Sequence, residues 1–186
     1  MKVKKLLVLV ALLSVWGGTM IFADSASSKI RVIINGSELD EAGVMNEGKT
    51  YLPLRQISNS LQALISWDEA SKKVTINKPN VHMFLFQNNT VFGKVSKGNR
   101  YTFSVWAQVD SLRMNISALK VTIADPSGRE ELIQSQDVNS QKDNFWFRTK
   151  DIRYAFEAGG SYKVRFYMKP DGDEWKVVSE KLIIAE

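Results

Sequence analysis

The chain has 186 residues, no cysteine, a single histidine and a formal net charge of +5. The absence of cysteine excludes disulfides, thiolate metal ligands and attachment of a lipid to a cysteine. A length of this order is typical of one large domain or two small ones.

Residues 1–23 have the pattern of a secretory signal peptide. Three lysines among the first five residues precede an apolar run at 6–16, and small residues around Ala23 offer a cleavage site. An uncleaved membrane anchor is the alternative, but the apolar run is at or below the roughly 20 residues that span a bilayer. We therefore predict an exported protein, secreted or associated with the cell wall, without a stable membrane span after cleavage.

Removal of this segment also changes the charge. It contains three lysines and no acidic residue, so the remaining chain has 22 basic and 20 acidic residues and a net charge of +2. The pI of about 9.3 belongs to the precursor. The sequence therefore predicts no nucleic-acid partner, and the mild basicity is compatible with an anionic wall.

Residues 48–76 show a strand–helix–strand pattern. Gly48 begins a turn, and Pro53 suits the first turn of a helix, where its missing N–H costs nothing. Apolar residues then follow at helical spacing over about three turns, at Leu54, Ile57, Leu61 and Leu64. An extended pattern returns at 64–67 and again at 74–76.

These motifs, in this order, resemble the copper amine oxidase-like N-terminal domain, or stalk domain, of secreted Gram-positive envelope proteins. The matching residues are Asn35-Gly36, Gly48-Lys49-Thr50, Pro53-Leu54-Arg55, Ile57, Leu61-Gln62-Ala63 and Trp67-Asp68. Two positions depart from the family pattern, with Asn59 in place of Glu and Gln62 in place of Gly. The resemblance covers residues 29–78 and implies a non-catalytic stalk domain, with Trp67 in its core.

Copper oxidase activity is excluded by the residues themselves. Such oxidases need three histidines and a tyrosine in an Asn-Tyr motif, whereas this chain has only His82, and Asn144 is followed by Phe145. One imidazole without a thiolate cannot build a copper site. We therefore predict no cofactor, no metal and no enzymatic activity.

Alternating apolar residues predict a second domain at 81–186. The strands are expected at 101–109, 119–123, 145–147, 162–168 and 175–184, with 130–138 and 81–87 as further candidates. Gly159-Gly160-Ser161-Tyr162 resembles the tyrosine corner of immunoglobulin-like domains, in which the hydroxyl hydrogen bonds to upstream backbone. The boundary is placed near 78–80, and the sequence leaves open which domain residues 81–90 join.

The predicted fold class is therefore α+β. A small strand–helix–strand stalk domain at 29–78 would precede an all-β, immunoglobulin-like sandwich of about seven strands. Within the sandwich, one set of aromatic and basic side chains lies opposite the apolar face of its strands. These candidate binding residues are Trp106, Trp146, Arg148, Arg165 and Tyr167.

Aromatic rings beside cations can stack on sugars and pair with phosphate or carboxylate. We therefore expect a non-catalytic binding or scaffolding protein of the cell envelope whose partner is a cell-wall polymer or another envelope protein. Packing of the same aromatics against the stalk domain is an alternative, as is an extracytoplasmic hydrolase or hydrolase inhibitor that acts through sandwich loops. Asp171-Gly172-Asp173-Glu174 suits a hairpin tip better than a calcium loop.

Overall fold

The computed structural model describes residues 29–140 and 142–186, so the predicted signal peptide lies outside the described residues. The chain divides into two compact units, of which the first ends at Pro53 and the second begins at Leu54. The domain boundary predicted near 78–80 stays a prediction.

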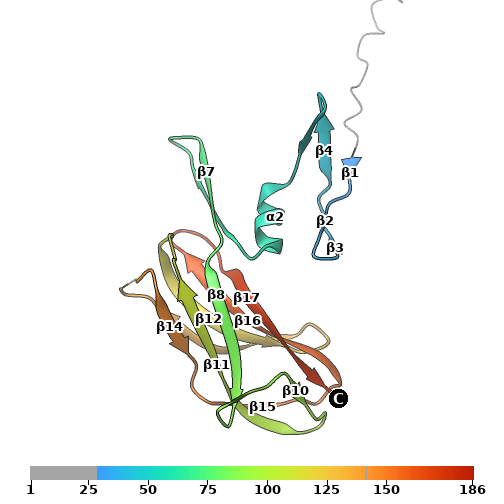
Figure 1. Cartoon of the computed structure of the whole chain (residues 1–186), viewed down its shortest axis with the longest axis vertical. Coiled ribbons are helices and arrows are strands. Elements are labelled where there is room, and N and C mark those ends of the chain that lie inside the picture. Colours follow the sequence, from blue (N-terminus) through green and yellow to red (C-terminus); the bar gives the residue numbers. More distant parts are fainter. Residues whose placement is uncertain (1–28, 141) are drawn as a thin grey trace, which may run out of the picture. The chain divides into compact units, whose positions relative to one another are not determined.

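The first unit consists of short strands joined by tight turns (Figure 1). One sheet has the order β1-β4-β5, and β2 and β3 form a separate hairpin. The strands are β1 (Lys29–Ile30), β2 (Ile33–Ile34), β3 (Ser37–Glu38), β4 (Gly43–Asn46) and β5 (Lys49–Tyr51). Both turn residues of each two-residue hairpin have positive φ, with 50° and 81° at Asn35-Gly36. This is the conformation that an Asn-Gly hairpin turn requires.

The second unit begins with the helix α2 (Leu54–Ser60), followed by the hairpin of β6 (Leu64–Asp68) and β7 (Lys73–Asn77). The helix ends through hydrogen bonds from Gln62 N to Asn59 O and from Ala63 N to Ser58 O. Gln62 has φ of 57°, a left-handed conformation that glycine adopts at lowest cost. This left-handed backbone conformation therefore explains why the family usually has glycine at this position.

Two sheets form a β-sandwich in the rest of the second unit (Figure 1). The first sheet has the order β10-β17-β16-β12-β13. Its strands are β10 (Lys94–Val95), β12 (Ile116–Ala124), β13 (Glu130–Asp137), β16 (Gly160–Pro170) and β17 (Lys176–Ala185). β10 pairs parallel to β17, and the other pairs are antiparallel.

The second sheet has the order β14-β11-β8-β9, and β15 also pairs with β11. Its strands are β8 (Asn80–Gln87), β9 (Thr90–Val91), β11 (Arg100–Asp110), β14 (Phe145–Arg148) and β15 (Ile152–Ala155). Because β8 pairs with β11 along seven residues, from Asn80 to Phe86, the segment that the sequence left unassigned belongs to the sandwich.

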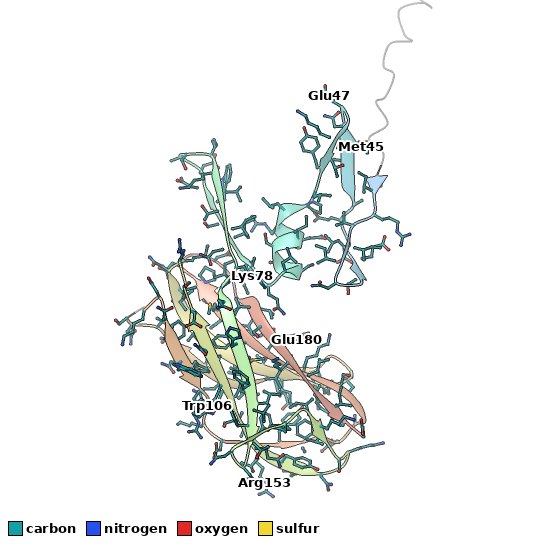
Figure 2. The ribbon with its side chains drawn as sticks, viewed as in Figure 1. Met45, Glu47, Lys78, Trp106, Arg153 and Glu180 are labelled. Carbon is teal, nitrogen blue, oxygen red and sulfur yellow. The ribbon has the colours of Figure 1, made fainter. Side chains whose placement is uncertain are left out.

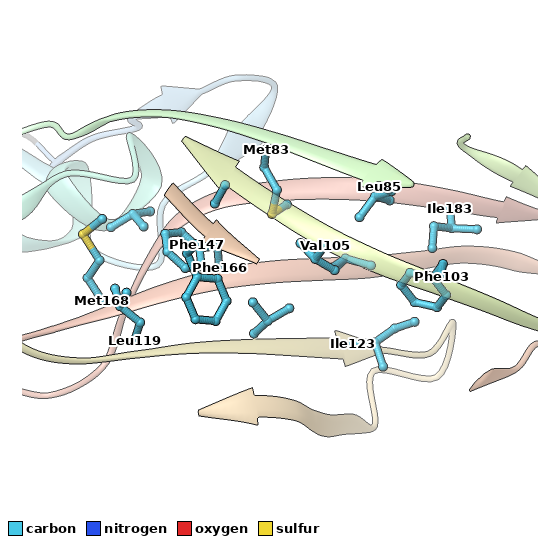
Figure 3. Close-up of a cluster of buried hydrophobic side chains, with 14 of the residues drawn as sticks. Met83, Leu85, Phe103, Val105, Leu119, Ile123, Phe147, Phe166, Met168 and Ile183 are labelled. Carbon is cyan, nitrogen blue, oxygen red and sulfur yellow. The ribbon is translucent and has the colours of Figure 1, made fainter. Parts of the chain in front are cut away.

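The core lies between these two sheets (Figure 3). Val105, Ala107 and Val109 of β11 are completely buried, as are Phe166 and Met168 of β16. Strict alternation produces this face, because every second side chain of a strand points to the same side. The intervening residues therefore form the two outer faces of the sandwich.

The predicted tyrosine-corner hydrogen bond is confirmed. The hydroxyl of Tyr162 donates to Ala158 O and accepts from Ala158 N, both at 3.0 Å. The ring is buried and packs edge-on against Phe156 at 4.9 Å between ring centroids. The assignment to an immunoglobulin-like class stays a prediction.

The predicted α+β class is wrong, because the described residues form an all-β protein with one helix of seven residues. The predicted helix of about three turns included Leu64, which instead opens β6. The side chains of Leu54 and Leu61 are 40% and 42% exposed, and Ser58 is the buried residue of α2. A helix of two turns without a buried apolar stripe cannot define a structural layer.

Candidate functional site

Three of the five predicted binding residues lie together on the outer side of the second sheet. Trp106 of β11 is paired in register with Arg148 of β14 on one side and with Phe84 of β8 on the other. Trp146 lies two residues before Arg148, on the same side of the strand. We call the surface formed by Phe84, Phe86, Trp106, Trp146 and Arg148 the aromatic face; Trp106 is labelled in Figure 2.

The rings of the aromatic face contact one another edge to face. Trp106 and Trp146 have ring centroids 6.3 Å apart at an interplanar angle of 81°, and Phe86 lies 5.5 Å from Trp106 at 63°. Trp146 is 61% exposed and Phe84 is 39% exposed, whereas Trp106 is partly covered. Such edge-to-face contacts fix ring orientation, so the exposed ring of Trp146 is held in place by its neighbour.

Arg148 covers part of this arrangement. Its guanidinium carbon lies 4.9 Å from the centre of the Trp106 ring, a cation–π contact. Its nearest acidic partner is Asp151, at 3.7 Å between Nη2 and Oδ1. That distance is too long for a hydrogen bond.

Two cavities border Arg148. One, of about 330 Å³, is lined by Phe86, Trp106 and Arg148 together with polar side chains from three segments, Asn88, Asn89, Thr102, Ser104 and Asp151. The other, of about 460 Å³, is lined by Trp146 and Arg148 and by polar residues that include Gln136, Asp137 and Asn139. Both combine aromatic walls with hydrogen-bonding groups, as binding sites for polar ligands do.

The indole nitrogen of Trp106 is buried and has no hydrogen-bond partner within the described residues. A buried donor without an acceptor costs free energy, and most such groups in native proteins are paired with protein or water. Trp106 also lines the smaller cavity.

Arg165 and Tyr167 belong to a different surface. Both lie on β16 in the first sheet, and their side chains point to the outer side of that sheet, away from the core and from the aromatic face. Glu180, which pairs with Arg165, is labelled in Figure 2. The structure therefore separates the five predicted residues into a group of three and a group of two.

The second group is held by contacts within the protein. Arg165 pairs with Glu130 and Glu180, each at 2.9 Å, and the Tyr167 hydroxyl donates to Glu130 at 2.6 Å. Burial raises the pKa of Glu130, but hydrogen bonds from Thr122 and Tyr167 and the charge of Arg165 outweigh it and leave this pKa below its usual value. Burial raises the pKa of Tyr167, and its hydrogen bond to Glu130 raises this pKa further.

Two residues of the aromatic face, Phe84 and Phe86, were missed in the sequence. They lie on β8 with the same parity as His82, opposite the buried Met83 and Leu85. The alternation was visible, but only assignment of this segment to the sandwich places the two rings beside Trp106. No sequence pattern indicated the polar loop residues that line the two cavities.

The expectation that Trp67 lies in the core of the stalk domain is wrong. Trp67 is 50% exposed, and its indole nitrogen donates to Glu69 at 2.6 Å. Arg55 forms no salt bridge within the described part of the chain. Both residues line a cavity of about 620 Å³ in the second unit, together with the side chains of Asp171 and Asp173.

A copper site does not fit the residues present. His82 is the single histidine of the chain and is paired in register with Gln108 on β11. In the described ranges, no three side chains of the metal-binding types gather at one place.

The fold and this surface define an all-β sandwich protein with a short strand–helix–strand segment before it and an exposed aromatic face. Residues 33–119 match the model of the family described as copper amine oxidase N-terminal domain. The predicted resemblance is thereby confirmed, and that domain is non-catalytic. The match runs beyond residue 78 through β8 and β11 into β12, so it includes Trp106. No curated protein matches the chain.

The one helix described, α2, has seven residues, so no helix in the described part of the chain is long enough to cross a membrane.

Proposed function

We propose that this is an exported, non-catalytic cell-envelope protein that binds a cell-wall polymer through the aromatic face. The observation that carries the proposal is the exposed ring of Trp146, fixed edge-on by Trp106 and flanked by Arg148. Lone exposed aromatics are common on protein surfaces. An ordered group of exposed aromatic residues beside polar cavities is far less common.

The chemistry of a polysaccharide suits this surface. The C–H faces of a sugar ring are apolar and pack on an aromatic ring, while its hydroxyls need hydrogen-bonding partners around the rim. Trp146 offers the platform, and Asn88, Asn89 and Asp151 offer amide and carboxylate groups at the adjoining cavity.

The absence of catalysis is part of the same proposal. The matched domain is non-catalytic. Among the described residues, each of the two cavities of the aromatic face has one carboxylate in its lining, Asp137 or Asp151, so this surface lacks the carboxylate pair that glycoside hydrolysis uses.

The proposal is tested by retention of the purified protein on isolated cell walls. Replacement of Trp146 by alanine removes the platform and should weaken binding by about tenfold or more, the effect of losing a central aromatic contact. Trp67→Ala is the matched control, because Trp67 is also about half exposed but lies on the β6–β7 hairpin. Equal retention of the Trp146→Ala variant and the unaltered protein would refute the proposed function.

A further inference from the structure

Arg148 and Arg165, on the two outer faces of the sandwich, differ in how many of their N–H donors are already paired within the protein. The guanidinium of Arg165 makes two ion pairs at 2.9 Å and is 24% exposed. The guanidinium of Arg148 makes no hydrogen bond to any residue of the described ranges, and its side chain is 55% exposed. Five N–H donors of one guanidinium therefore remain for a ligand or for water.

Arg148 is nevertheless held in position. Its guanidinium lies over the ring of Trp106, which is itself fixed by edge contacts with Phe86 and Trp146. A stacked guanidinium keeps its N–H donors in the plane of the group, where a bidentate acceptor binds them. The entropy lost on binding is correspondingly smaller, because the side chain is already ordered.

The surroundings of Arg148 favour an anion. The segment from β14 to β15, residues 145–155, carries three basic residues and one acidic residue, Asp151. Arg153 is paired in register with Thr102, which lies on the same outer side of β11 as Trp106. Asp151 is mostly exposed and too distant to hydrogen bond, so it neutralises Arg148 only in part.

Arg148 lines both cavities of the aromatic face. A polymer that stacks a ring on Trp146 and continues toward the smaller cavity must pass this guanidinium. An anionic group at that point of the polymer would lie beside the N–H donors of Arg148, which make no hydrogen bond within the described residues.

We propose that Arg148 is an anion-binding residue and that the bound polymer carries phosphate or carboxylate groups along its chain. This inference rests on the proposed function, because it specifies the chemistry of the ligand at the same surface. The anion would accept two hydrogen bonds from the guanidinium, as carboxylates and phosphates do in bidentate pairs with arginine. The sugar or polyol next to it would lie against Trp146.

The test measures affinity for isolated cell walls for the unaltered protein and for Arg148→Gln, Arg148→Lys and Arg31→Gln. Arg148→Gln should bind about tenfold or more weakly, because charge-assisted bidentate hydrogen bonds are the strong ones. Arg148→Lys, which keeps the charge without the planar fork, should be intermediate. Arg31→Gln removes the same charge from the first unit, at an exposed ion pair with Glu38, and should bind normally. Added salt should weaken binding of the unaltered protein.

Treated walls then distinguish the two sources of the anion. Mild acid removes phosphate-linked polymers, and carbodiimide amidation neutralises carboxylates. Loss of binding after the first treatment identifies phosphate, and loss after the second identifies carboxylate. The inference is overturned if Arg148→Gln binds normally and neither treatment matters while Trp146→Ala still loses binding. In that case the proposed function stands, whereas normal binding by Trp146→Ala removes both.

Discussion

Replacement of Tyr162 by phenylalanine tests how much the hydrogen bonds of its hydroxyl stabilise the sandwich. The hydroxyl donates to Ala158 O and accepts from Ala158 N, both at 3.0 Å, while the ring itself is buried against Phe156. Phenylalanine keeps the ring and leaves no cavity. The substitution therefore removes two hydrogen bonds and leaves two partly buried backbone groups without a partner.

The magnitude follows from those two bonds. A typical hydrogen bond contributes about 0.5–1.5 kcal/mol net, and an unsatisfied buried group costs about 1–3 kcal/mol. Tyr162→Phe should therefore lower the free energy of unfolding by about 1–3 kcal/mol. Urea unfolding followed by tryptophan fluorescence measures this, and the slope with denaturant should not change, because the surface exposed on unfolding is the same.

Tyr101→Phe provides the control. The Tyr101 hydroxyl accepts a hydrogen bond from Ser96 N at 3.0 Å, at an exposed site where water can replace it. Its substitution should change stability by less than about 0.5 kcal/mol. A Tyr162→Phe effect no larger than that of Tyr101→Phe would refute the view that the corner stabilises the sandwich.

Two further predictions concern single positions. Gln62→Gly should raise the free energy of unfolding by about 0.5–1 kcal/mol, because Gln62 is strained at a φ of 57° and the relief exceeds the entropy cost of glycine; an unchanged urea midpoint would contradict this. The folded-state pKa of Glu130 lies below its ordinary value, so Glu130 contributes stability above the unfolded pKa that is lost as the pH falls through the folded one. Glu130→Gln should therefore lose less stability than the unaltered protein between about pH 6 and pH 3, and parallel losses in a pH series of urea midpoints would show that Glu130 does not contribute.

The sequence predicted which side of each strand is buried, but not which strands share a sheet. Alternation placed Trp106, Arg148 and Tyr167 on outward positions, and the structure agrees for all three. Only the pairing of β14 with β11 brings Arg148 over Trp106, and only the pairing of β16 with β12 and β17 carries Tyr167 to the other sheet. Pairings between distant segments depend on tertiary contacts that a local pattern does not encode.

For the helix, the local apolar pattern itself gave a wrong prediction. Leu54, Ile57, Leu61 and Leu64 match a helical repeat, yet α2 ends at Ser60 and Leu64 is the first residue of β6. Gln62 takes a left-handed conformation between them, which breaks the helix. The family's usual glycine at this position indicates such an end, whereas the apolar spacing alone predicts a longer helix.

The most direct measurement is a titration of ¹⁵N-labelled protein with polymer released from the cell wall, observed at the indole N–H signals of its tryptophans. If the polymer binds at the aromatic face, the signals of Trp106 and Trp146 should shift with ligand concentration, while those of Trp67 and Trp175 should not. Shifts confined to Trp67 or Trp175, or no shift at saturating polymer, would contradict binding through the aromatic face.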